Sequence, residues 1–251
     1  MIFYLKLVKI LNVNNSNMSI VKTEAFVLKS FKYGETSKIV TLFTKDFGKM
    51  NAIVKGARNY KSKLCGTLES MNYINAVIYF KENRELQLIS GAEYKKSFSY
   101  IQNDFDKLEA AYKIIEILSR SVINNDTNKF MFELLMKTFE KLNDAKENYS
   151  LYVLFFLIQL TKNIGLSPDF DDLNSDNETF FTKNEFYVIK SEISTLKSLE
   201  KCTVDTVGDI KADSEILKKL ISTYERFLTN HTLGNKYYKS TKVFRELNLS
   251  A

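Results

Sequence analysis

The side chains in this sequence whose types and spacing could do chemistry are four cations around a glycine. Residues 48–63 read GKMNAIVKGARNYKSK; they alternate polar and apolar residues over 50–54, as a strand does, and break at Gly56. The cations are Lys55, Arg58, Lys61 and Lys63. Such a loop can neutralise the phosphates of an anionic polymer. An ordinary solvated lysine-rich loop explains the same pattern, so both interpretations stay open at this point.

The positive charge of the chain is concentrated in its first third. The formal net charge over 251 residues is +6, and residues 18–98 hold 14 Lys or Arg against 7 Asp or Glu, a net of +7. The other residues therefore sum to −1. Residues 45–63 alone contain six Lys or Arg and one acid, Asp46. This local bias predicts a polyanionic partner, with nucleic acid ahead of a membrane surface.

Motifs for covalent catalysis or for a metal site are not found in the sequence. It has no phosphate-binding glycine loop and no framed nucleophile, and its one histidine, His231, is expected to cap a helix or lie on the surface. Cys65 and Cys202 are far apart, which favours a reducing compartment over a disulfide scaffold. The acids Asp171 and Asp172 are interpreted as loop solvation. We therefore expect a protein that is not an enzyme and needs no cofactor.

The elements that must position the basic loop are five short strands. Alternating or β-branched stretches predict strands over residues 20–30, 37–44, 49–55, 68–80 and 86–94, with turns at Gly34 and Gly48. Five strands in about 80 residues without a long helix between them favour a small closed barrel, of which the oligonucleotide-binding (OB) barrel is the best-known form.

Beyond residue 104 the apolar residues recur at helical spacing. Helices are predicted over 105–118 with Asp104 as N-cap, and over 129–142, 151–164, 192–199, 215–228 and 242–247. The segment 151–164 is apolar almost all round and too short for a bilayer, so it is expected to be the central helix of a bundle. Residues 180–189 are predicted to form a hairpin. The domain boundary is expected within 97–103.

The first 17 residues precede this pattern. They are apolar up to Val13, are interrupted by Lys6 and Lys9, and are too short to span a membrane. We interpret them as an incorrectly assigned start or as an extra strand.

At this point the chain resembles the RecO family of bacterial recombination and repair mediators. The resemblance rests on GETSKIVTLFT at 34–44, FGK at 47–49, KGAR at 55–58, the pairs Lys61-Ser62, Leu68-Glu69 and Ala92-Glu93, and, near the end, residues 224–228, His231 and Lys239-Ser240. It covers roughly residues 18–247, and the block from 34 to 58 is its most specific part.

The resemblance implies an α+β protein, which we divide into three parts. Two of these are an OB-fold DNA-binding domain with a five-stranded barrel at 18–98 and an all-α C-terminal domain at 99–251 with a small hairpin insertion near 169–191. The third, the extension at 1–17, precedes the resemblance and is read from the sequence itself. The resemblance also implies binding of single- and double-stranded DNA, annealing of complementary strands, and loading of RecA with RecR on DNA coated by single-stranded-DNA-binding protein (SSB). RecF and RecA are further candidate partners, and a cytoplasmic, nucleoid-associated location is expected.

One departure from the family concerns zinc. Many members carry a four-cysteine zinc site after the long central helix, whereas residues 166–191 of this chain contain no cysteine. We therefore expect a zinc-free member. Packing of Phe180, Phe181, Phe186 and Tyr187 is expected to hold the hairpin instead.

The predicted DNA-binding residues are Lys38, Lys49, Lys55, Arg58, Lys61 and Lys63. They would neutralise phosphates and release counterions with little base readout. Tyr33, Phe47 and Tyr60 could stack bases, although core packing is the better interpretation for Phe47. Two alternatives remain open, a protein-interaction adaptor and an RNA-binding OB protein. The salt dependence of binding separates the first from a DNA-binding protein, and competition between DNA and RNA separates the second.

Overall fold

The computed structural model describes residues 18–62, 64–167, 179–181 and 187–231. The chain divides into two compact units. One comprises the described residues up to Ser97 together with Ile123–Lys129, and the other comprises Phe98–Val122 and the described residues from Phe130 onward. The return of residues 123–129 to the first unit was not predicted.

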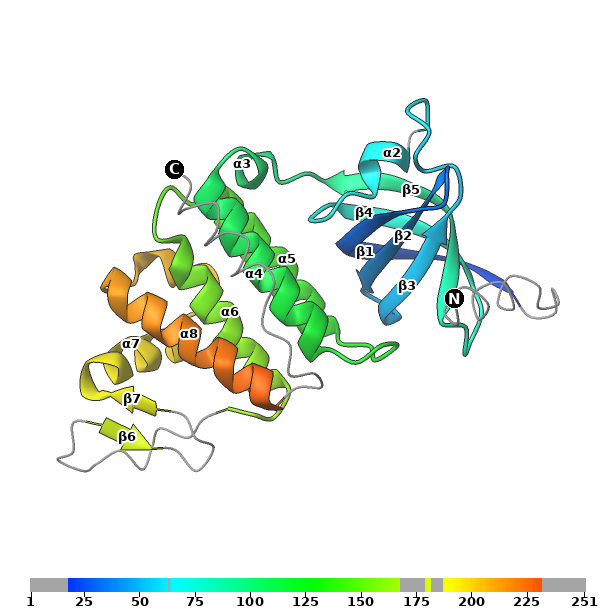
Figure 1. Ribbon diagram of the computed structural model, residues 1–251. Coiled ribbons are helices and arrows are strands. Elements are labelled where there is room, and N and C mark those ends of the chain that lie inside the picture. The colour runs from blue at the N-terminus through cyan, green and yellow to red at the C-terminus, as the bar shows by residue number, and fades with distance from the viewer. Residues whose placement is uncertain (1–17, 63, 168–178, 182–186, 232–251) are drawn as a thin grey trace. The chain divides into compact units, whose positions relative to one another are not determined.

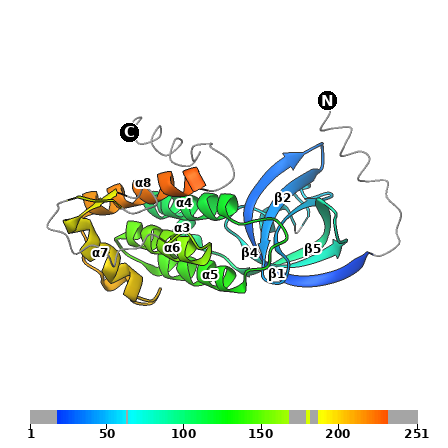
Figure 2. The same cartoon turned by 90° about the horizontal axis from the view of Figure 1, so that it is seen from below.

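The first unit is a closed, OB-like sheet of five strands. The strands are β1 (Ser19–Tyr33), β2 (Ser37–Thr44), β3 (Gly48–Val54), β4 (Tyr73–Phe80) and β5 (Leu86–Lys96). They follow the order β1-β2-β3-β5-β4, and the ring closes because β1 pairs with β4 as well as with β2 (Figure 1 and Figure 2). The pairing of β3 with β5 is parallel and the others are antiparallel. The predicted five-stranded OB-like sheet is confirmed.

Residues of alternate positions along each strand fill the interior of this sheet. Val40 and Leu42 of β2 are fully buried in the main core cluster together with Ala52 and Val54 of β3. Ile39 and Ile53 lie on the opposite face of the same strands, since successive strand residues point to opposite sides. They form a second, smaller apolar cluster with Leu86.

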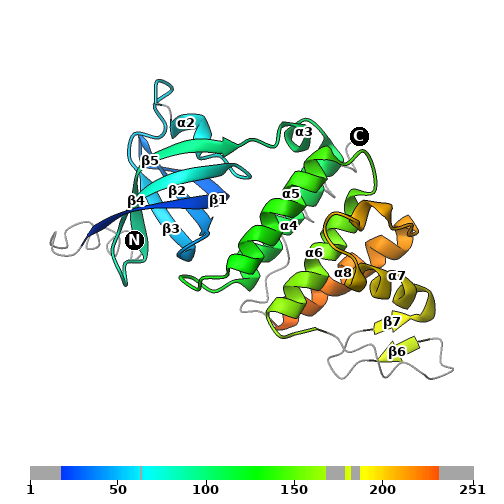
Figure 3. The same ribbon diagram turned by 180° about the vertical axis from the view of Figure 1, so that it is seen from behind.

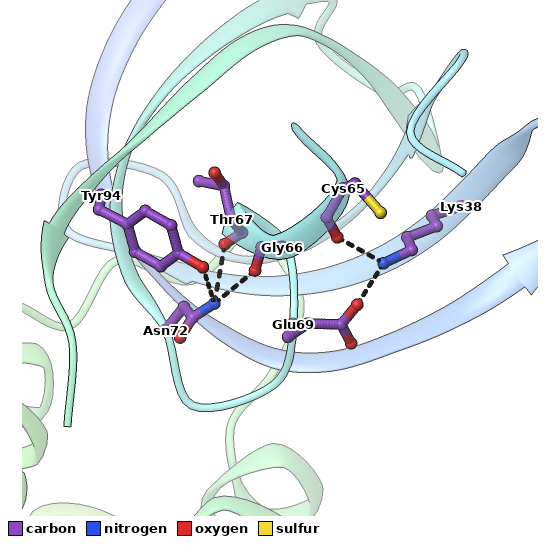
Figure 4. A network of polar contacts seen from close by, with 7 residues as sticks. All are labelled: Lys38, Cys65, Gly66, Thr67, Glu69, Asn72 and Tyr94. Atoms are coloured by element: carbon purple, nitrogen blue, oxygen red, sulfur yellow. Dashed lines mark hydrogen bonds and ion pairs between the residues drawn. The ribbon is translucent and has the colours of Figure 1, made fainter. Parts of the chain in front are cut away.

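The strand predicted over 68–80 begins only at Tyr73. A short helix, α2 (Leu64–Thr67), and a turn precede it. Met71 has φ 74°, in the left-handed region, outside the conformation of a regular strand. The side-chain amide of the buried Asn72 donates to the carbonyls of Gly66 and Thr67 at 2.9 and 3.1 Å and so holds the turn against α2 (Figure 4). Leu68 and Met71 are therefore buried without belonging to a strand, and Leu68 packs into the main core of the sheet.

The segment Ile123–Lys129 is hydrogen-bonded to the turn between β2 and β3. The backbone amide of Asn125 donates to the carbonyl of Lys49 at 2.8 Å, and the hydroxyl of Thr127 donates to the carbonyl of Asp46 at 3.3 Å. Gly48 has φ 67°, and a Cβ there would lie 2.2 Å from the carbonyl oxygen of Asp126. Only glycine can occupy this position without displacing the segment.

The second unit consists mainly of helices. They are α3 (Ser99–Gln102), α4 (Phe105–Ser121), α5 (Lys129–Asp144), α6 (Tyr149–Asn163), α7 (Lys190–Lys201) and α8 (Ser214–His231), with a 3-10 turn at Val207–Asp209. Ten residues of α6 are buried, around its whole circumference, and it contacts α4, α7 and α8 (Figure 3). The predicted central helix is therefore confirmed.

Local signals in this unit behave as expected. The side chain of Asp104 accepts from the backbone amide of Lys107 at 3.0 Å and caps α4. Strands β6 (Thr179–Phe181) and β7 (Tyr187–Ile189) pair as the predicted hairpin.

The hairpin's turn, residues 1–17 and the predicted helix over 242–247 lie outside the described residues. Helix α3 and the 3-10 turn were not predicted. None of the helices that the structure describes has the length and apolarity to cross a membrane.

Candidate nucleic-acid interface

The loop that follows β3, residues 55–62, is here called the basic loop. It leaves the strand through Gly56, whose φ of 70° lies in the left-handed region that glycine tolerates. The next residue, Ala57, is fully buried in the main core of the sheet. The loop is therefore pinned to the barrel immediately after it turns, with the cations Lys55 and Arg58 exposed on either side.

Arg58 ties the basic loop to the turn between β1 and β2. Its backbone amide donates to the carbonyl of Thr36 at 2.9 Å, and its guanidinium donates to the carbonyl of Gly34. A guanidinium has five N–H donors, so one such bond leaves most of them free for an anion. Two segments separated by more than 20 residues thus present one surface.

The tip of the basic loop is organised by Asn59. The Asn59 side-chain oxygen accepts from the backbone amide of Lys61 at 3.0 Å, and its carbonyl accepts from the amide of Ser62 at 2.8 Å. The Lys61 ammonium lies 5.6 Å from the ring centroid of Tyr60, within the range of a cation–π contact. Lys55, Arg58 and Lys61, three of the predicted cations, are therefore exposed on one loop. Lys63 lies outside the described residues.

Lys38 has a different environment. It alternates with Val40 and Leu42 along β2, so it points to the core side of the sheet, and its side chain is only 8% exposed. Its ammonium donates to the carbonyl of Cys65 at 2.9 Å and is paired with Glu69 (Figure 4). This placement argues against a phosphate contact and indicates that Lys38 fastens α2 and the segment after it to the barrel.

Lys49 lies at the far end of β3 from the basic loop. Six strand steps separate it from Lys55, which is about 20 Å. Burial lowers the pKa of its ammonium, and the nearby charge of Lys29 lowers it further. Lys49 therefore does not join the basic loop, and it forms a separate positive region with the exposed Lys29.

Lys32 is an exposed cation that the sequence argument did not select. It lies on β1 with its Cα opposite that of Lys38, one residue before the end of the strand. The turn at Gly34 that receives Arg58 begins two residues later. Pairing the first two strands about that turn places Lys32 opposite Lys38, but only the contact of Arg58 with the turn relates Lys32 to the basic loop, so this position could not be read from the sequence.

The three candidate aromatics differ strongly in exposure. The ring of Phe47 packs against the core with its centroid 4.8 Å from that of Phe80, as predicted. Tyr33 is half-buried against the cluster of Ile39 and Ile53. Tyr60, at the tip of the basic loop, is 83% exposed. Of the three, only Tyr60 presents an open ring face.

Titratable groups elsewhere in the described part of the chain do not form a metal cluster. Within these residues no three His, Cys, Asp or Glu side chains are grouped to hold an ion. Cys65 and Cys202 are free thiols, and His231 contacts the carbonyl of Phe227 at 2.8 Å through Nδ1. The basic loop therefore combines exposed positive charge on a hydrogen-bonded backbone with the exposed ring of Tyr60.

Comparison with known families gives two matches that together cover most of the chain. The sequence model described as "Recombination protein O N terminal" matches residues 18–98, and the one described as "Recombination protein O C terminal" matches residues 102–241. The second match alone covers more than half of the chain.

Curated relatives agree with these matches. A protein named DNA repair protein RecO from Chlorobium limicola is 31% identical over 249 residues, covering 86% of this chain and 95% of its own length. Proteins of the same name from Chloroherpeton thalassium and Salinibacter ruber are 36% and 35% identical over 149 and 153 residues, covering 58% and 59% of their own lengths. On these sequence matches, this chain belongs to the RecO family of DNA repair proteins.

Proposed function

We propose that this chain binds single- and double-stranded DNA through the basic loop and anneals complementary strands. The observation that carries the proposal is that Lys55, Arg58 and Lys61 are exposed together on a loop that is pinned by Ala57 and tied to a neighbouring turn. The proposed DNA-binding residues also include Lys63, on the basis of the sequence, and Lys32, on the basis of its position on β1.

The proposed mechanism is electrostatic. The cations neutralise phosphates on each strand and release the condensed counterions, which lowers the repulsion between two strands that approach one another. Backbone contacts carry no sequence information, so any complementary pair can anneal. No bond is made or broken, and the role is therefore one of binding and not of catalysis.

Membership of the RecO family supports a proposal about the partners. We propose that residues 18–98 bind DNA and that residues 99–251 form a helical domain. We further propose that the protein works with RecR to load RecA on single-stranded DNA coated by SSB. RecF is a further candidate partner, and the nucleoid is the expected place of action. The names of the relatives support a role in DNA repair.

The test reverses the charge of the basic loop. A variant with Lys55, Arg58, Lys61 and Lys63 replaced by Glu should lose DNA affinity by orders of magnitude, because up to four attractive contacts become repulsive. The slope of log K against log salt should become shallower by about 0.7 per lost contact on single strands. Annealing, followed by fluorescence of labelled complementary strands, should fall in step with affinity.

A matched control carries the same change of net charge on the other unit. Four exposed lysines there are replaced by Glu: Lys137, Lys197, Lys201 and Lys211. This control should lose much less affinity. If both variants bind alike, or if the basic-loop variant binds and anneals as the parent does, the proposal is wrong. RNA that displaces DNA at equal concentration would favour the RNA-binding alternative, and partner binding that is insensitive to salt would favour the adaptor.

A further inference from the structure

Tyr60 has no structural role that its surroundings explain. At 83% exposure it is the most exposed large aromatic or apolar side chain among the described residues. A ring with so much surface in water contributes little to the core. Within the described part of the chain, the group that its ring meets is the ammonium of Lys61, at 5.6 Å.

The backbone that carries Tyr60 is nevertheless held firmly. Arg58, two residues before it, is bound to the carbonyls of Gly34 and Thr36. Asn59 and Ser62 close a turn around it through the bond from the amide of Ser62 to the carbonyl of Asn59 at 2.8 Å, and the amide of Cys65 continues the turn by donating to Ser62 at 3.0 Å. Since the backbone is already ordered, little further entropy is lost when a ligand binds there.

The chemistry around the ring selects for an unpaired nucleobase. Lys55, Arg58 and Lys61 supply charge for the backbone of a strand, and an aromatic face beside them stacks a base of any identity. A base inside a duplex is already stacked on both sides, so it must first be unstacked at a cost of a few kcal/mol. A ring at this place therefore discriminates between strand states and not between sequences.

We propose that Tyr60 is a stacking platform that makes the basic loop bind single-stranded DNA more tightly than double-stranded DNA. This inference rests on the proposed function. When a complementary strand pairs with the bound one, its bases stack on each other and leave Tyr60. The annealed product is then held by phosphate contacts alone, so the ring favours capture of single strands and release of the duplex.

The test compares affinities of Tyr60 variants for the two forms of DNA at one salt concentration. Tyr60→Ala should weaken binding of a single-stranded oligonucleotide by about 5- to 150-fold, the range expected for one lost base stack. Binding of the matching duplex should change by less than about twofold, and the salt slope on either form should not change, because no charge is lost. Tyr60→Phe, which keeps the ring, should bind single strands as the parent does.

A second readout uses the absence of tryptophan from this chain. In Tyr60→Trp the indole is the only one present, and stacking with a base should quench its emission when single-stranded DNA is added but not when the duplex is added. Tyr100→Trp, at a site that is 64% exposed on α3 of the other unit, is the control and should not be quenched.

The outcomes separate this inference from the function on which it rests. Equal loss on both forms of DNA, no loss in Tyr60→Ala, or an unquenched indole at position 60 overturns the stacking role. If the charge-reversed basic loop still loses DNA in that case, the proposed function stands and only the role of Tyr60 is wrong. If the charge-reversed loop binds normally, both are wrong.

Discussion

The ion pair between Lys38 and Glu69 allows a sharp test of whether Lys38 supports the barrel or contacts DNA. The Lys38 side chain is 8% exposed, and its ammonium is held by the carbonyl of Cys65 and the carboxylate of Glu69. Glu69→Ala leaves a buried ammonium without its counter-charge. Removing one partner of a fully buried pair costs about 3–5 kcal/mol.

The expected cost is smaller here because the Glu69 side chain is 58% exposed and water screens the pair. We expect Glu69→Ala to lower the free energy of unfolding by about 2 kcal/mol. For a chain of this size that is a fall in Tm of about 4–8 °C. Lys38→Met removes the charge together with its need for a partner, and should cost about 1 kcal/mol for the lost bond to Cys65.

The assay is a double-mutant cycle followed by urea and thermal unfolding. The double variant should be about as stable as Lys38→Met alone, which gives a coupling of about 2 kcal/mol between the two side chains, the full cost of Glu69→Ala. In parallel, the salt slope of DNA binding by Lys38→Met should equal that of the parent. A coupling near zero, together with a slope that falls by about 0.7, would show that Lys38 contacts a phosphate and would refute the structural interpretation.

Three further predictions concern backbone strain, pH and metal. Gly48→Ala should lower the free energy of unfolding by about 2 kcal/mol or more in urea titrations, because its Cβ would lie 2.2 Å from the carbonyl oxygen of Asp126 at a positive φ. The control is Gly34→Ala, which has open space around its Cβ and should cost only about 1 kcal/mol. The pKa of Glu24 is lowered from 4.5, mainly by the hydrogen bond from Lys95, so its stabilising effect is present above pH 4.5 and is lost as the pH falls through the lower folded pKa. The free energy of unfolding, measured from pH 6 to pH 3, should therefore fall less steeply in Glu24→Gln than in the parent, and an unchanged profile would contradict this. EDTA should leave Tm unchanged, since residues 166–191 contain no cysteine, and stoichiometric zinc in the purified protein would count against it.

Much of the fold was predictable because its signals are local. The β-branched and apolar runs within residues 37–44 and 49–55 mark strands, and helical spacing after Asp104 marks α4 together with its cap. The apolar run over 151–164 likewise predicts a helix that is buried on all sides. Burial periodicity and capping depend on residues within a turn or two, so one sequence suffices to read them.

The basic loop was predictable in composition but not in shape. Gly56 and the cations around it indicate a cationic surface loop. That Arg58 would bind the turn at Gly34, and that Ala57 would enter the core, depends on how β1, β2 and β3 are brought together. The open ring of Tyr60 follows from that docking, since a residue's exposure is decided by its neighbours in space.

Tertiary structure alone decided the environments of Lys38, Lys49 and the segment 123–129. Alternation with Val40 places Lys38 on the interior face, but its partner Glu69 arrives from 31 residues away through α2. Residues 123–129 reach Lys49 from more than 70 residues along the chain. The entropic cost of bringing two distant segments together rises only slowly with the length of chain between them. Many alternative long-range pairings therefore have similar costs, and the sequence alone does not distinguish them. The packing of the whole barrel selects among them, and a single sequence does not reveal that choice.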